Sequence, residues 1–109
     1  MNYSVKTIEV FEKQAKRLIK KYASLRKELI ELVQSLKESP TQGTAIGKNC
    51  YKIRVAIASK GKGKRGGARV ITYIVIQDKT VYLLSIYDKS DKETLSDTEL
   101  SLLLQDVSL

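Results

Sequence analysis

Residues 68–76 read ARVITYIVI, a nearly continuous run of β-branched and aromatic side chains. Such a run is typical of a central strand that is covered on both faces. The stretch before it, YKIRVAI at residues 51–57, alternates apolar residues with Lys52 and Arg54, as a strand does. The stretch after it, VYLLSIY at residues 81–87, reads as another strand. Consecutive strands with short links favour an antiparallel meander, so we expect a small antiparallel sheet.

Helical patterns flank this sheet on both sides in the sequence. Residues 3–8 alternate and predict a short first strand, and two apolar stripes at helical spacing follow it. Ser24 is a candidate N-cap between the two helices, which predicts an αα-hairpin. Near the C-terminus, Ser96 and Glu99 form an S-x-x-E capping box that begins a third helix. The expected order is β-α-α-β-β-β-α, an α+β fold with the helices on one face of the sheet.

Length and composition exclude several classes of protein. The chain has 109 residues, so we expect a single domain across residues 1–109. No apolar run approaches the roughly 20 residues that span a bilayer, and the start of the chain lacks a signal-peptide pattern. With one cysteine, Cys50, and no histidine, the chain lacks the ligands of a Cys/His zinc site and the residues of Ser-His-Asp and Cys-His catalysis. These features predict a cytoplasmic protein with no metal, no cofactor and no membrane segment.

The positive charge is concentrated in one part of the chain. Residues 1–69 hold 17 Lys and Arg against 5 Asp and Glu, whereas residues 70–109 hold 3 against 7. Residues 48–69 contain eight basic residues and no acidic one. A stripe of this kind is the electrostatic footprint of a protein that binds nucleic acid or another polyanion, although a solvated basic surface is the simpler alternative.

Alternation along the strands gathers part of this charge on one face. If Ile53 and Val55 face the helices, Lys52 and Arg54 point the opposite way. Arg69 would be an unusual core residue, so its face of the next strand is expected to be open too. Tyr73 shares that face and could stack on a base, as could Tyr82 or Tyr87. Further candidate RNA- and ribosome-binding residues lie on the flexible loop at residues 59–67 and after the last strand: Lys60, Lys62, Lys64, Arg65 and Lys92.

A cationic cluster suits phosphodiester cleavage in RNA. Cleavage needs a base for the 2′-hydroxyl, cations around the developing phosphorane and an acid for the departing 5′-oxygen. In a chain without histidine, a lysine among other cations is the natural base, and arginine offers a planar fork for the phosphoryl group. Composition alone favours simple phosphate binding over catalysis, because most Lys/Arg clusters only bind the backbone.

Four motifs resemble the RelE/ParE toxin superfamily, most closely its HigB branch. They are YKIRV at residues 51–55, KGKGKRGG at residues 60–67, ARVI at residues 68–71 and LLSIYDK at residues 83–89. The resemblance covers nearly the whole chain in element order and residues 51–95 in motif detail. It implies a RelE-like fold and a toxin of a type II toxin–antitoxin system that cleaves mRNA in the ribosomal A site, without a metal.

The resemblance also implies roles for individual residues. Lys52 and Arg54 match the family's basic pair on the strand before the loop. Arg69 matches the arginine that stabilises the transition state, and Lys89 stands where RelE proteins place a basic residue, a candidate acid or phosphate ligand. Leu95 occupies the position of a tyrosine that stacks on the mRNA base in RelE, so another tyrosine must stack here or stacking is absent.

The implied partners are the ribosome, mRNA and an acidic HigA-like antitoxin with a helix-turn-helix domain, through which the pair would reach operator DNA. Two alternatives belong to other classes. One is a ParE-like toxin that inhibits DNA gyrase, and the other is a basic RNA-binding module without catalysis. The basic set Lys52, Arg54 and Arg69, together with the loop, favours the ribonuclease over the gyrase inhibitor.

Overall fold

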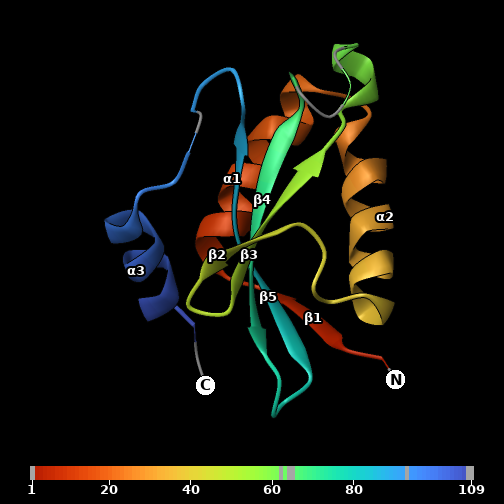
Figure 1. The fold of residues 1–109 in the computed structure, drawn as a ribbon. Coiled ribbons are helices and arrows are strands. Elements are labelled where there is room, and N and C mark those ends of the chain that lie inside the picture. The colour runs from red at the N-terminus through yellow and green to blue at the C-terminus, as the bar shows by residue number, and fades with distance from the viewer. Residues whose placement is uncertain (1, 62, 64–65, 93, 108–109) are drawn as a thin grey trace.

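The computed structural model describes residues 2–61, 63, 66–92 and 94–107. The α+β class is confirmed: a five-stranded sheet runs between α3 on one side and α2 on the other (Figure 1). Among the described residues, no helix has the length and apolarity needed to cross a membrane. The elements in chain order are β1 (Ser4–Thr7), α1 (Glu9–Lys21), α2 (Leu25–Glu38), β2 (Thr44–Gly47), β3 (Cys50–Val55), the 3-10 turn η1 (Ala58–Lys60), β4 (Ala68–Val75), β5 (Thr80–Asp88) and α3 (Asp97–Gln105).

The sheet is mixed, with the strand order β1-β5-β4-β3-β2. The meander of β3, β4 and β5 is antiparallel, as the sequence predicts, but β1 pairs in parallel with β5. A wholly antiparallel sheet was therefore the wrong expectation for the first strand. Parallel pairing needs a long intervening connection, and the helices and strands between β1 and β5 provide one.

Strand β2 is an addition that the sequence did not predict. It is short and largely exposed, and it lacks the apolar alternation that marks a strand. It pairs with β3 through a two-residue turn in which Lys48 and Asn49 have φ angles of 57° and 62°. Two successive positive φ values define the type I′ hairpin turn, whose twist matches that of the flanking strands.

The helical hairpin covers one face of the sheet, as expected. This face carries Ile53 and its ladder partners Val70 and Ile86, all buried. The predicted apolar stripes of both helices supply the opposing layer of the core. The buried residues of these stripes are Phe11, Ala15, Leu18, Leu25, Leu29, Leu32 and Leu36.

Helix α3 lies against the other face, which corrects the expectation that all helices share one side. Its predicted capping box is present, with Ser96 accepting from the Glu99 backbone N–H and Glu99 accepting from that of Ser96. The ammonium of Lys48 donates to Ser101 at 2.6 Å and ties the helix to the β2–β3 turn. An uncovered second face would leave Ile71 and the apolar side of α3 in water, so burial of both explains the two-sided arrangement.

Candidate functional site

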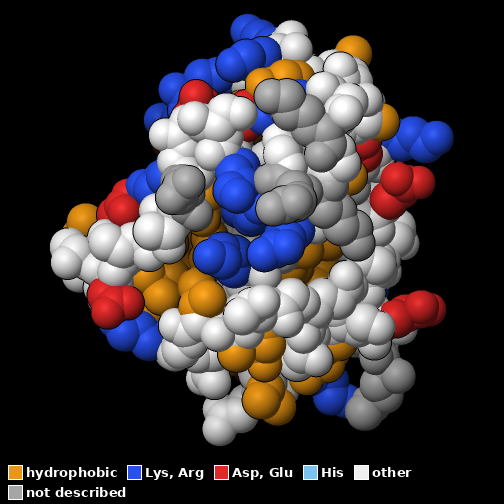
Figure 2. Space-filling model, turned by 45° about the horizontal axis from the view of Figure 1, so that its top comes forward, with side chains coloured by type: hydrophobic (Ala, Val, Ile, Leu, Met, Phe, Trp, Pro, Cys, Tyr) orange, Lys and Arg blue, Asp and Glu red, His pale blue; other side chains and the backbone are white. Residues whose placement is uncertain are grey.

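Strand β3 presents Lys52 and Arg54 on the face away from the helical hairpin. Their neighbours Ile53 and Val55 are buried, whereas Lys52 is half-buried and Arg54 is exposed. This pattern confirms the predicted alternation. Both cations line a groove of about 580 Å³ that also takes in Gln42–Thr44. Figure 2 shows lysine and arginine side chains gathered in the middle of one face of the molecule.

Two glycines let other segments approach the backbone of this strand. A Cβ on Gly43 would stand 2.3 Å from the carbonyl oxygen of Lys52, and one on Gly67 would stand 2.0 Å from that of Val55. No real Cβ tolerates such distances, so both positions require glycine. The second of them belongs to the Gly-Gly step of the predicted loop, and its close approach packs the start of β4 against β3.

Arg69 lies on the predicted face but is not openly exposed. It stands opposite Arg54 in the β3–β4 ladder and opposite Tyr87 in the β4–β5 ladder, with only 4% of its surface accessible. The expectation of an open position here is therefore wrong, because Arg69 is buried although it lies on the same face as Lys52 and Arg54. Burial, and next the charge of Arg54, lower the pKa of Arg69, and its guanidinium donates to the carbonyl of Ala68 at 3.1 Å.

Arg54, Arg69 and Tyr87 form a row across three neighbouring strands. Alternation within each strand did not predict this row, because it depends on the register between strands. The side chain of Tyr87 is 8% exposed, and its hydroxyl has no hydrogen-bond partner among the described residues. Burial raises its pKa, Arg69 lowers it, and Glu99 raises it. The remaining candidate stacking residues form a pair: Tyr73, half-buried, stacks on Tyr82 with ring centroids 6.3 Å apart.

The basic loop divides into residues that the structure places and residues that it does not describe. Lys62, Lys64 and Arg65 lie outside the described residues. Lys60 does not project into solvent as expected, because its ammonium pairs with the buried carboxylate of Asp88 at 2.5 Å.

The two lysines that follow β5 have different surroundings. The ammonium of Lys92 pairs with the carboxylate of Glu99, so it is partly neutralised. Lys89 is half-buried, and its backbone N–H donates to the carbonyl of Gly67 at 3.0 Å. That bond extends the β4–β5 ladder beyond Ala68 and Asp88, and it brings Lys89 to the same end of the sheet as Arg69.

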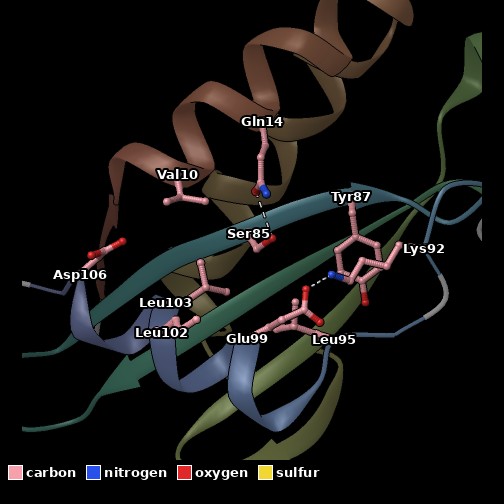
Figure 3. Close-up of a pocket in the computed structure, with 10 residues that line it drawn as sticks. All are labelled: Val10, Gln14, Ser85, Tyr87, Lys92, Leu95, Glu99, Leu102, Leu103 and Asp106. Carbon is pink, nitrogen blue, oxygen red and sulfur yellow. Dashed lines mark hydrogen bonds and ion pairs between the residues drawn. The ribbon is translucent and has the colours of Figure 1, made fainter.

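A cavity of about 260 Å³ lies between α1, β5 and α3 (Figure 3). The Lys92–Glu99 ion pair crosses it beside Tyr87, and Leu95 forms part of its wall. Leu95, which the resemblance matches to a stacking tyrosine, therefore lines this cavity. Among the described residues, no group of acidic or cysteine side chains could hold a metal ion.

Comparison with solved structures shows the same fold in bacterial toxins. The Escherichia coli toxin RelE, as an arginine-to-alanine double mutant in the free state, matches with a TM-score of 0.61 and 20% identity, over 99% of this chain and 100% of that chain. The toxin–antitoxin complex RelBE2 from Mycobacterium tuberculosis matches with a TM-score of 0.62 and 16% identity, over 81% of this chain and 99% of that chain. The intact E. coli RelBE complex matches with a TM-score of 0.61 and 20% identity, over 79% of this chain and 95% of that chain.

Fold and charge together define a small α+β protein with a cationic groove on its sheet. Residues 8–107 match the family described as the RelE toxin of the RelE/RelB toxin–antitoxin system. The chain belongs to the RelE toxin family.

Proposed function

We propose that this protein is a ribosome-dependent endoribonuclease that stops translation by cutting mRNA. The observation that carries the proposal is the register of β3 and β4, which sets Arg54 opposite Arg69 and leaves Lys52 on the same face. Endoribonuclease activity is the activity of RelE-family toxins, and family membership supports it for this chain.

The reaction is an attack of the 2′-oxygen on the neighbouring phosphorus. The 2′-oxygen loses its proton and bonds to phosphorus, while the bond from phosphorus to the 5′-oxygen breaks and that oxygen gains a proton. We assign the base to Lys52, which lines the groove, and the stabilisation of negative charge on the phosphorane to Arg54 and Arg69. Lys89, at the same end of the sheet as Arg69, is the candidate acid or phosphate ligand.

The burial of Arg69 supports a role beyond general attraction for RNA. A guanidinium in a water-poor site acts on a developing charge more strongly than one in bulk solvent. A side chain that only attracts the phosphates of RNA does not need to be buried. Arg54 is exposed and can meet the substrate first, whereas Arg69, its partner in the ladder, is buried.

The proposed partners are the ribosome, its bound mRNA and an acidic antitoxin, all in the cytoplasm. Solved RelE relatives are seen in complex with an antitoxin. The loop motif at residues 60–67 supports placement in the HigB-like branch, and with it a HigA-like antitoxin that carries the contact with operator DNA. Lys62, Lys64, Arg65 and Tyr73 remain candidates for ribosome or RNA contact.

Cell-free translation with the purified protein tests the proposal. Mapping of mRNA 5′ ends should show new ends within translated codons, and only when ribosomes are present. Cleavage of naked RNA would indicate a general nuclease. Intact mRNA combined with inhibition of gyrase supercoiling would favour the ParE-like alternative, and intact mRNA without that inhibition would leave a binding module.

A further inference from the structure

The carboxylate of Asp88 is buried and accepts three hydrogen bonds. It closes β5, and its side chain has no accessible surface. It accepts a hydrogen bond from the Tyr22 hydroxyl at 2.6 Å, from the Lys60 ammonium at 2.5 Å and from the Ser90 backbone N–H at 2.9 Å. The Lys60 ammonium also lies 5.5 Å from the centroid of the Tyr22 ring. The carboxylate therefore joins the end of α1, the turn η1 and the residues after β5.

The turn η1 is held from a second side by the start of α2. The backbone N–H of Ala58 donates to the carboxylate of Glu28 at 2.7 Å, and that of Ser59 donates to the Ser24 hydroxyl at 2.9 Å. With the Lys60 ion pair, these bonds fix both ends of η1. The basic loop therefore begins at Lys60, which is held in place by these bonds. We call the Asp88 carboxylate and the bonded turn η1 the support.

This support borders two of the proposed site residues. Asp88 stands opposite Ala68 in the β4–β5 ladder, and Arg69 follows Ala68 directly. Lys89 follows Asp88 directly, and its N–H bonds to the carbonyl of Gly67. Movement of the Asp88 backbone would therefore shift both cations at once.

We propose that Asp88 is a positioning residue, whose carboxylate holds Lys60 and Tyr22 and thereby fixes Arg69 and Lys89 for the reaction. The expected effect of Asp88 on cleavage rests on the proposed function. Its effect on the positions of Arg69 and Lys89 rests on the hydrogen bonds alone. It assigns Lys60 to the support of the site in place of RNA contact, because the Lys60 side chain is only 9% exposed.

The electrostatics of Asp88 agree with this geometry. Burial would raise its pKa, but the hydrogen bonds from Lys60, Tyr22 and Ser90 outweigh burial and lower the pKa from 3.8 to about 2. The group is therefore a stable carboxylate at neutral pH. Removal of either charge would leave the other buried without its partner, which is far less favourable than the intact pair.

The structural arm of the test is amide hydrogen exchange in Asp88→Asn and in the wild type. The N–H groups of Lys60, Gly61, Lys89 and Ser90 should exchange about tenfold faster or more in the variant, because the bonds that hold them open more often. Those in the centre of β4 should be unchanged. Asp78→Asn removes the same charge from an exposed turn at the other end of β5 and should leave all of these rates as in the wild type. Unchanged exchange at Lys60 and Lys89 in Asp88→Asn would overturn the inference.

The functional arm separates the rate of cleavage from the affinity for the ribosome. With saturating protein, the single-turnover cleavage rate of Asp88→Asn should fall roughly tenfold to a hundredfold, because small misplacements of site residues are sufficient for such losses. Ribosome affinity should change by less than about twofold, because no contact residue is altered. A weaker affinity with a normal rate at saturation would contradict the positioning role.

Two further variants keep the test decisive if Asp88→Asn fails to fold. Tyr22→Phe removes one hydrogen bond to the carboxylate, and Lys60→Met removes the ion pair. Both should lower the cleavage rate and leave the salt dependence of ribosome binding unchanged. A salt slope that falls by about 0.7–0.9 in Lys60→Met would instead show that Lys60 contacts a phosphate. If the wild type cleaves no mRNA, the proposed function fails, and the exchange data still decide the structural claim.

Discussion

Arg54 and Arg69 lie directly opposite each other across the β3–β4 ladder, and burial, followed by the charge of Arg54, lowers the pKa of Arg69. Like charges directly opposite on neighbouring strands destabilise a sheet. A bound phosphate would relieve this repulsion, so under the proposed function the pair is better suited to a complex with RNA than to the free protein. Stability and activity should therefore respond in opposite directions to changes at this pair.

Arg54→Gln tests that relationship. We expect the free energy of unfolding to rise by about 0.5 kcal/mol, because the substitution removes one of two positive charges that face each other across the ladder. The cleavage rate should fall roughly tenfold to a hundredfold with the loss of a charge-assisted phosphate contact. Urea unfolding and single-turnover cleavage measure the two effects. Lys52→Gln is the matched control for stability, because Lys52 stands opposite the uncharged Ile71. A loss of stability in Arg54→Gln alone would refute the repulsion argument.

Tyr87→Phe removes a buried hydroxyl that has no hydrogen-bond partner among the described residues. An unsatisfied buried hydroxyl is unfavourable, so we expect the variant to be as stable as the wild type or more stable by about 1 kcal/mol. Thermal unfolding checks this expectation. Tyr22→Phe provides the comparison, because its hydroxyl donates to Asp88 and its removal should destabilise the protein. Equal losses of stability in the two variants would mean that the Tyr87 hydroxyl makes a hydrogen bond as stabilising as that of Tyr22.

Acid should weaken the fold through Asp88. Because the folded state holds its pKa at about 2, below the ordinary 3.8, the carboxylate stabilises the protein above about pH 4. That contribution is lost as the pH falls from about 4 towards 2. Asp88→Asn should be less stable than the wild type at pH 6, and the difference should shrink in this acid range. Urea unfolding across the range measures it, and a difference independent of pH would contradict the assignment.

We expect the loop residues Lys62, Lys64 and Arg65 to contact the phosphates of ribosomal RNA. Replacement of all three by serine should weaken ribosome binding and reduce its dependence on salt. Each lost phosphate contact lowers the slope of log K against log salt by about 0.7–0.9. Binding measured over a series of salt concentrations decides the matter, and an unchanged slope would show that the loop does not touch phosphate.

Local sequence patterns predicted the parts of the fold that depend on neighbours in the chain. The apolar stripes of α1 and α2, the capping box of α3 and the outward direction of Lys52 and Arg54 all follow from spacing. Each is confirmed. Strand β2 escaped prediction because its four residues carry no periodic signal and depend on a turn with two positive φ angles.

The environment of the candidate site depended on contacts between distant residues. Alternation assigned Arg69 to a face of the sheet, but its burial on that face follows from tertiary packing. Lys60 belonged to a basic run that reads as solvated, and its partner Asp88 stands 28 residues further along the chain. A lone acid at the end of an apolar strand was the available sign that a buried cation would be needed there.

The most direct test of the central claim compares the wild type with Arg69→Ala on ribosome-bound mRNA. Purified proteins are mixed in excess with stalled translation complexes, and the cleavage rate is followed by mapping mRNA 5′ ends. We expect the cleavage rate of Arg69→Ala to fall roughly a hundredfold to a thousandfold, the usual effect of removing a group that stabilises transition-state charge. Ribosome affinity and the far-ultraviolet circular dichroism spectrum should stay close to those of the wild type. Cleavage by Arg69→Ala at the wild-type rate would contradict the account.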